Sequence, residues 1–152
     1  MRLITTITFI ILFSTSLIAE IKKPTPEINP EDVVKIQLSS LMNNNDPYKN
    51  AGIEQTWEFA HPSNRVFTGP IQRFTQMMYA PSYAVMLDHK KHDILEVKID
   101  NDIAYFFIEL TSIDGKMFGF KWTLEKVNEE GIFKDCWMTT SVSTPMPLST
   151  SS

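Results

Sequence analysis

One short segment of the sequence gathers acidic and histidine side chains, the types that bind metals or move protons. It reads Asp88-His89-Lys90-Lys91-His92-Asp93. A metal site would require the neutral imidazoles of His89 and His92 to converge on one ion, whereas residues three apart on a strand face opposite sides. They converge only if Lys90-Lys91 forms a tight turn, and those lysines would repel a cation. We therefore expect a solvated turn and assign no metal ligand.

A second group of residues combines large aromatic rings with polar side chains. An apolar cavity between helices and a sheet, with a few polar groups at its mouth, is a common ligand site. The residues expected to form such a site are Trp57, His61, Arg73, Phe74, Tyr83 and Trp122. Arg73 or Tyr83 would orient a carboxylate or carbonyl group of the ligand. The alternative is that the rings fill the space completely and that Arg73 pairs with an acidic neighbour.

Signatures of known catalytic chemistry are missing from the sequence. It contains no phosphate-binding glycine loop, no serine-hydrolase elbow and no calcium-loop spacing. Cys136 is the single cysteine, and its strand-like neighbours Trp137 and Met138 predict a buried thiol rather than a nucleophile. Thr68-Gly69-Pro70 is interpreted as a helix cap and not as an anion site. We assign no catalytic residue, no metal and no cofactor.

Length and charge limit the classes of protein to consider. The chain has 152 residues, with 14 Lys and Arg against 18 Asp and Glu, a formal net charge of −4. This length suits one domain, and a hydrophobic content of 43% suits a folded core. An acidic balance does not attract polyphosphates, so we expect no nucleic-acid partner.

The first 19 residues predict export. The stretch from Leu3 to Ala19 is uncharged and follows Arg2, which is the pattern of a bacterial signal peptide, and it is short for a spanning helix. Cleavage after Ala19 would release a periplasmic or secreted protein with no membrane partner. The alternative is an uncleaved N-terminal anchor. Residues 20–29 contain two prolines and are expected to form an extended linker.

Capping residues and apolar spacing predict three helices. Asn29 is a good N-cap, and Pro30 suits the first position of a helix. Asp46-Pro47 repeats this signal, and Pro62 is expected to stop the second helix. The expected helices run from residue 30 to the asparagines at 43–45, from 46 to about 60 and from 70 to 80, with an irregular segment over 63–69.

From Tyr83 onward the apolar residues alternate with polar ones, which is the pattern of strands with one buried face. Asp114-Gly115 is a strong hairpin signal. The segment with Tyr105 and Phe107 is apolar on both faces, so its second face needs cover. The expected strands are residues 94–99, 103–112, 116–127 and 132–142, with a shorter strand around 84–88. The fold class is therefore α+β, with three N-terminal helices packed on a strongly curved antiparallel meander.

Several segments of the chain resemble a known family. They are Val34–Leu41, Trp57–Asn64, Thr68–Phe74, Met78 with Tyr83, and Asp135–Met138. They are similar to an uncharacterised domain-of-unknown-function family, number 4864, within the nuclear transport factor 2-like superfamily. The resemblance covers residues 30–142 and implies a cone of helices and curved sheet, but it implies no reaction and no catalytic residue. Residues 143–152 are expected to form a disordered tail.

Three classes of function remain open. The first is an exported, non-catalytic domain that holds a small apolar or amphipathic ligand in the cone. The second is an interaction module that forms a homodimer through the outer face of the sheet, with Tyr105 and Phe107 in the interface. The third is a small enzyme doing proton-transfer or dehydration chemistry. It would need two titratable groups, such as His61 and an acid, within hydrogen-bond reach in the cavity.

Overall fold

The computed structural model describes residues 20–149. The predicted signal peptide, residues 1–19, lies outside the described residues. Within residues 20–149 no helix is long and apolar enough to cross a membrane. The predicted linker, residues 20–29, is held to the body of the domain by Gln55. The side-chain oxygen of Gln55 accepts from the Lys22 backbone N–H at 2.7 Å, and its amide donates to the Lys22 carbonyl at 2.9 Å.

The first helix is confirmed, and the second is shorter than predicted. Helix α1 spans Pro30–Met42, and the side chain of Asn29 caps it by accepting from the Asp32 backbone N–H at 2.9 Å. Helix α2 spans Ala51–Glu58. It cannot begin at Asp46 because Asn50 is left-handed, with φ of 66°, and a residue in that conformation interrupts a right-handed helix.

The segment after α2 is helical, which contradicts the predicted irregular stretch over residues 63–69. Helix α3 spans Pro62–Thr68, so Pro62 begins a helix rather than stopping one. Helix α4 spans Ile71–Tyr79, as predicted, and a short helix α5 follows at Pro81–Ala84. The predicted short strand around residues 84–88 is therefore wrong, because the chain is still turning there.

The described residues form one antiparallel sheet. Strands β1–β4 pair in sequence order, and β5 pairs with β3. The strands are β1 Lys91–Asp100, β2 Ile103–Thr111, β3 Met117–Lys126, β4 Trp137–Val142 and β5 Met146–Leu148. The predicted hairpin at Asp114-Gly115 is confirmed, with Gly115 at a φ of 83°.

Two predictions at the C-terminal end are corrected. The fourth strand begins at Trp137 and not at residue 132, because Asp135 turns the chain with a φ of 63°. The predicted disordered tail does not describe residues 146–148, since they pair with β3 as strand β5. The reason is that Leu148 lies opposite Met117 and close to Gly119, where β3 offers open pairing positions.

The core lies between the helices and one face of β2 and β3. Its sheet side consists of Ala104, Phe106, Ile108, Leu110, Phe120, Trp122 and Leu124, all buried. Helix α1 contributes Val33, Val34, Leu38 and Leu41 from one stripe. Helix α2 approaches α1 closely at Gly52, where a Cβ atom would stand 2.1 Å from the Ser40 carbonyl oxygen. Only glycine allows this approach.

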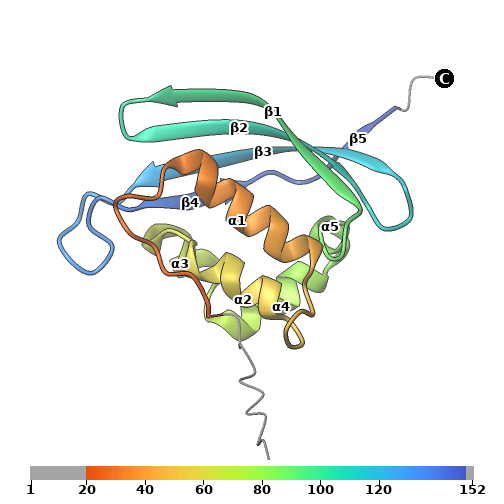
Figure 1. Ribbon diagram of the computed structural model, residues 1–152, viewed down its shortest axis with the longest axis horizontal. Helices are drawn as coiled ribbons and strands as arrows, with labels where there is room; N and C mark the ends of the chain where they lie inside the picture. The colour runs from red at the N-terminus through yellow and green to blue at the C-terminus, as the bar shows by residue number, and fades with distance from the viewer. Residues whose placement is uncertain (1–19, 150–152) are drawn as a thin grey trace, which may run out of the picture.

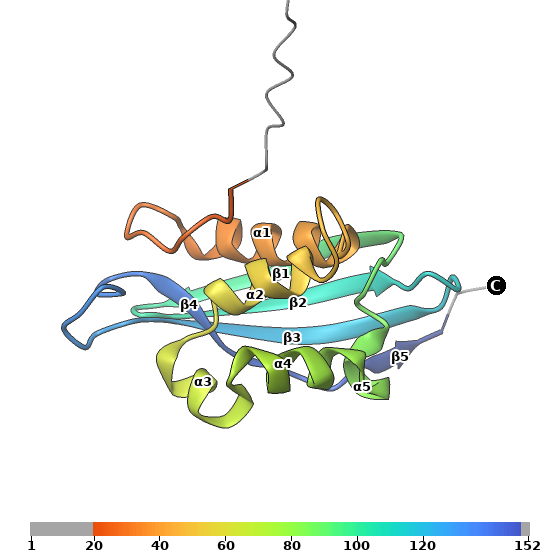
Figure 2. The same cartoon turned by 90° about the horizontal axis from the view of Figure 1, so that it is seen from below.

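The helices do not cover the sheet evenly. Helices α1 and α3 both contact β4. In Figure 1, β1 lies along the margin of the sheet that points away from α2, α3 and α4. In the view of Figure 2, α1 is drawn above the strands and α3 and α4 below them, and Phe74 and Met78 of α4 pack in the same core as α1. The helices therefore gather around the β4 side, and the far half of β1, residues 95–100, is exposed.

Candidate functional site

A cavity of about 160 Å³ lies where the helices meet the β4 side of the sheet. Helices α1, α2, α3, α4 and α5 and strands β3 and β4 all contribute side chains to its wall. Its floor is apolar and buried. The floor residues are Leu41, Phe74, Met78, Met86 and Trp122. Such a floor favours an apolar group over a charged one.

A buried polar network stands at the base of the cavity. The indole N–H of Trp122 donates to Gln37 Oε1 at 3.0 Å, and the hydroxyl of Thr139 donates to the same oxygen at 2.7 Å. The amide of Gln37 donates to the Thr56 carbonyl at 3.1 Å, which joins α1 to α2. Within residues 20–149 every buried side-chain nitrogen and oxygen has a partner. Each polar atom of the base therefore has a partner, and the network fixes the ring of Trp122.

The mouth of the cavity is half-exposed and polar. The Tyr83 hydroxyl donates to the Val142 carbonyl at 3.2 Å, and the Thr140 hydroxyl donates to the Thr123 carbonyl at 3.2 Å. Ser141 is exposed at the rim. Each hydroxyl has one hydrogen, which it donates within the protein, and two lone pairs on its oxygen. The oxygen can therefore accept a hydrogen bond from a ligand. A polar end of a ligand would therefore meet the mouth, and its apolar end the floor.

Three of the six predicted site residues line this cavity, namely Phe74, Tyr83 and Trp122. The other three lie outside it. The Trp57 ring packs 5.1 Å from that of Phe74 but does not line the cavity. Arg73 is exposed on α4. His61 caps α3, and its Nδ1 accepts from the Ser63 backbone N–H at 3.1 Å.

His61 faces a separate, open hollow together with Glu125, Glu129 and the β1–β2 turn. Burial lowers the pKa of His61, and the nearby charges of Glu125 and Glu129 oppose that shift. The pair of groups that acid–base chemistry requires is therefore not brought into the cavity. Among the described residues lining the cavity, Tyr83 is the only one with an ionisable side chain. No group of three or more potential metal ligands occurs in residues 20–149.

Sequence reasoning identified Trp122 but missed its polar partners Gln37 and Thr139. Gln37 is 1% exposed, although it is polar, because it stands in the apolar stripe of α1 between Val34 and Leu41. That position was the available signal, since a polar residue on a buried face requires a partner. Its partners Trp122 and Thr139 are 85 and 102 residues away in the chain, which no local pattern reveals.

Arg65, a polar residue beside the predicted site, has a structural role. Its guanidinium donates to the carbonyls of Trp57, Glu58 and Ala60 at 2.9–3.0 Å, which lie at and just after the end of α2. The same group lies 5.0 Å from the ring centre of Trp57. Arg65 thus holds Trp57 in place and closes α2.

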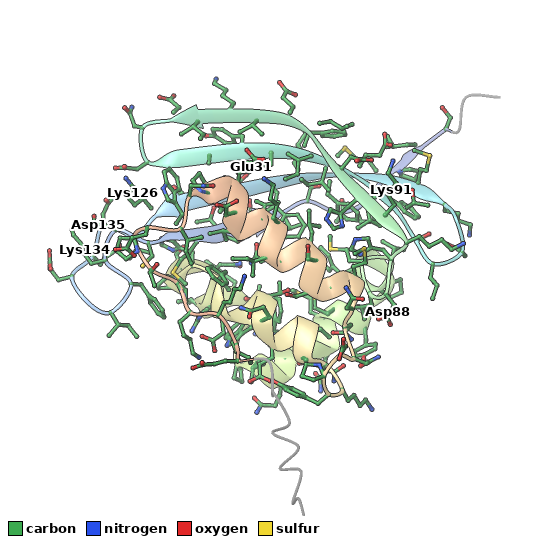
Figure 3. The ribbon with its side chains drawn as sticks, in the orientation of Figure 1. Glu31, Asp88, Lys91, Lys126, Lys134 and Asp135 are labelled. Atoms are coloured by element: carbon green, nitrogen blue, oxygen red, sulfur yellow. The ribbon has the colours of Figure 1, made fainter. Side chains whose placement is uncertain are left out.

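The predicted solvated turn at residues 88–93 is corrected. His89 is 2% exposed, and its Nε2 lies 2.7 Å from Nδ1 of His92. The two rings converge because the chain bends at Lys90, between them, before β1 begins. Figure 3 labels Asp88 and Lys91, which mark this corner at the start of β1. The two nitrogens bind each other, so they do not form an open pair of metal ligands.

The hydrogen bonds fix the protons of this histidine pair. Nδ1 of His89 lies 2.7 Å from the Met86 carbonyl, which can only accept, so this nitrogen carries a hydrogen. Nε2 of neutral His89 then accepts from His92. A second proton on His89 would oppose that bond. Burial, with a smaller contribution from the charge on His92, lowers the pKa of His89 to about 4. Burial also lowers the pKa of His92.

The predicted interface residues lie on the outer face of the sheet. Tyr105 is 44% exposed. Phe107 is half-buried, because its ring lies over Gly119, where a Cβ atom would stand 2.7 Å from Phe107 Cζ. The prediction that Cys136 is buried is confirmed, and burial raises the pKa of its thiol. That shift makes the thiol a poorer nucleophile.

The fold and the cavity define an α+β domain with a ligand-sized internal space. No family model, curated protein or solved structure matches the chain. The function is therefore inferred from the cavity itself.

Proposed function

We propose that this chain is an exported, non-catalytic domain that binds a small apolar or amphipathic molecule in the cavity between α1, α2, α4 and strands β3 and β4. The observation that carries the proposal is the combination of a buried apolar floor with a half-exposed polar mouth in a space of about 160 Å³. Ligand sites commonly have this composition. The hydrogen-bond network at the base of the cavity also supports ligand binding, because it holds Trp122 in one position and so fixes the shape of the floor.

The size of the cavity limits the ligand. An engineered cavity of about 150 Å³ in another protein stays dry and binds benzene. A space of about 160 Å³ therefore suits one aromatic ring or a short alkyl group. A larger amphipathic ligand would place its polar part at the mouth, beside Tyr83 and Thr140. Three methionines, Met77, Met78 and Met86, line the space, and their flexible side chains adapt to ligands of different shape.

The cone of the nuclear transport factor 2-like superfamily is the architecture that we propose. Two register shifts support curvature of the sheet, one at Leu95 in β1 and one at Thr140 in β4. The cavity between helices and sheet also suits a cone. Membership of domain-of-unknown-function family 4864 is proposed on the segments quoted above. Export rests on the uncharged stretch from Leu3 to Ala19.

The catalytic alternative has less support. Proton transfer in the cavity would need at least two titratable groups within reach of a substrate. His61, the residue considered for that role, faces the separate hollow with Glu125 and Glu129. We therefore place ligand binding before proton-transfer or dehydration chemistry.

The test measures binding of benzene to the purified protein by thermal unfolding. We expect benzene to raise the melting temperature, because a ligand that binds only the folded state stabilises it. Val142→Trp and Met77→Trp each place a large ring at the half-exposed mouth and should abolish the shift. Val66→Trp is the matched control, since Val66 is 77% exposed on α3 and lies off the cavity.

Two results would contradict the proposal. One is a wild-type protein whose melting temperature is unchanged at saturating benzene. The other is a benzene shift that survives in both mouth variants while they fold normally, because binding would then occur elsewhere.

A further inference from the structure

Strand β1 is the uncovered margin of the sheet. It pairs with β2 on one side only, so its other side is a free edge within the described chain. Its apolar side chains are unusually exposed, at 56% for Leu95, 43% for Val97 and 55% for Ile99. Figure 1 shows no helix beyond this edge. A long apolar edge of this kind attracts another strand.

The backbone groups of the same residues point to the free edge. The Ser112 N–H donates to the Lys116 carbonyl and the Lys126 N–H to the Asp102 carbonyl, so even-numbered residues of β2 bond to β3. Odd-numbered residues of β2 then bond to β1, and their opposite residues there are Glu96, Lys98 and Asp100. Because bonding direction alternates along a strand, Val97 and Ile99 direct their N–H and C=O groups outward.

Two charges flank Val97 on this strand. Glu96 and Lys98 are exposed, and neither forms an ion pair with any residue from 20 to 149. They lie on the outer face, opposite Phe107 and Tyr105 of β2. Their opposite signs, one residue either side of Val97, make the strand complementary to an antiparallel copy of itself.

We propose that a second copy of this chain pairs with β1 in antiparallel orientation, with Val97 on the two-fold axis. In that register Val97 lies opposite the partner's Val97, and Glu96 lies opposite the partner's Lys98, once on each side of the axis. Leu95 lies opposite the partner's Ile99 in the same symmetric way. The dimer thus forms one continuous sheet, joins both pairs of charges and covers the exposed apolar side chains.

Neighbouring registers are disfavoured by charge. A shift that centres the axis on Glu96 places two glutamates opposite each other, and one that centres it on Lys98 places two lysines opposite each other. Like charges directly opposite destabilise an antiparallel pair. The proposed interface is the free edge of β1. It differs from the outer face of the sheet around Tyr105 and Phe107, which stays accessible when two β1 edges pair.

The first test introduces a cysteine at the axis of the full-length protein. In the proposed dimer the two Cα atoms at position 97 would lie about 5.5 Å apart, within the range of a disulfide. We expect Val97→Cys to give a disulfide-linked dimer under mild oxidation, measured by mass spectrometry. Leu95→Cys is the matched control. It should stay unlinked, because the two copies of position 95 would be about 14 Å apart.

The second test exchanges the charges and measures the dimer dissociation constant by analytical ultracentrifugation. Glu96→Lys and Lys98→Glu each place like charges opposite each other twice, so each should weaken the dimer at least about tenfold. The double variant, Glu96→Lys with Lys98→Glu, restores opposite charges and should restore the dissociation constant. Glu129→Lys, an exposed loop variant with the same change of net charge as Glu96→Lys, should leave it unchanged.

Three outcomes would overturn the proposal. A wild-type protein that remains monomeric at millimolar concentration would show that the bulge at Leu95 and the edge charges protect the strand instead. Equal crosslinking at positions 95 and 97 would reject the register. A dimer that Phe107→Glu dissociates and Glu96→Lys does not would place the interface on the outer face.

Discussion

The β3–β4 side of the sheet, called here the covered margin, and the edge strand β1, the uncovered margin, have different surroundings, although apolar residues alternate with polar ones in both β3 and β1. On the β3–β4 side Leu124 is fully buried, and a cavity lies beneath the helices. On the β1 side Val97 and Ile99 belong to an equally regular alternation and are about half exposed. The difference teaches that alternation predicts which residues share a face, whereas the position of the helices decides which face is covered.

The largest effect that we expect is the cost of truncating the covered margin. Leu124→Ala should lower the free energy of unfolding by about 3 kcal/mol, because it leaves a cavity in a closed core. Val97→Ala should cost less than about 1 kcal/mol in the monomer, since much of that side chain already meets water. Urea denaturation at low protein concentration measures both. Equal costs would contradict the contrast between the two margins.

The corner at His89, just before the uncovered strand β1, should respond to pH. The pKa of His89 is about 4 in the folded protein, against an ordinary value of 6.5, so the unfolded chain binds the proton more tightly. The stability that neutral His89 provides is therefore complete above pH 6.5, falls as the pH decreases and is lost by about pH 4. The loss should reach about 3 kcal/mol. Chemical denaturation between pH 7 and pH 5 measures the slope.

The control for this prediction is His89→Gln. It removes the titrating group, so its stability should change less with pH over the same range. A smaller slope should remain, because burial also lowers the pKa values of His61 and His92. Identical slopes in the wild type and His89→Gln would show that His89 does not carry the effect.

Removing the buried hydrogen bonds of Gln37 should have a smaller effect on the free energy of unfolding. It tests how much the polar network stabilises the covered margin. Gln37→Leu introduces an apolar side chain of similar size and removes the hydrogen bonds that Gln37 makes with Trp122 and Thr139 in the buried network. It also removes the bond to the Thr56 carbonyl, which keeps its bond from the Phe59 N–H at 3.3 Å. The cost should be about 2 kcal/mol. Gln76→Leu, at an exposed position of α4, is the matched control and should cost little. A Gln37→Leu protein as stable as the wild type would show that the network adds no net stability.

Local signals predicted much of the fold. Asn29 caps α1 through its own side chain, and Asp114-Gly115 closes a hairpin between adjacent strands, so both signals act over a few residues. The signals that failed were ambiguous. Pro62 can stop one helix or begin the next, and only the His61 cap and the helix that follows decide between them. Strand β5 was missed because its partner in β3 lies far away in the sequence.

About half of the candidate site was predictable, again because local patterns identify some residues and not others. Phe74 and Trp122 are large apolar residues in clear periodic patterns, and they reach the cavity. Arg73 and His61 were chosen for their chemistry, but the turn of α4 and the start of α3 direct them elsewhere. The contact between Gln37 and Thr139 depends on tertiary packing, which a single sequence does not express.

The glycine at position 52 has a consequence for the evolution and engineering of this protein. A methyl group there would meet the backbone of α1, at Ser40 and at Asn44, so even alanine would act as a wedge between the two helices. Gln37 of α1 and Thr56 of α2 belong to the same two helices, and both side chains line the ligand cavity. The width of the cavity therefore depends on Gly52, a residue that does not line it. A variant designed to widen the cavity would change the α1–α2 contact at this position.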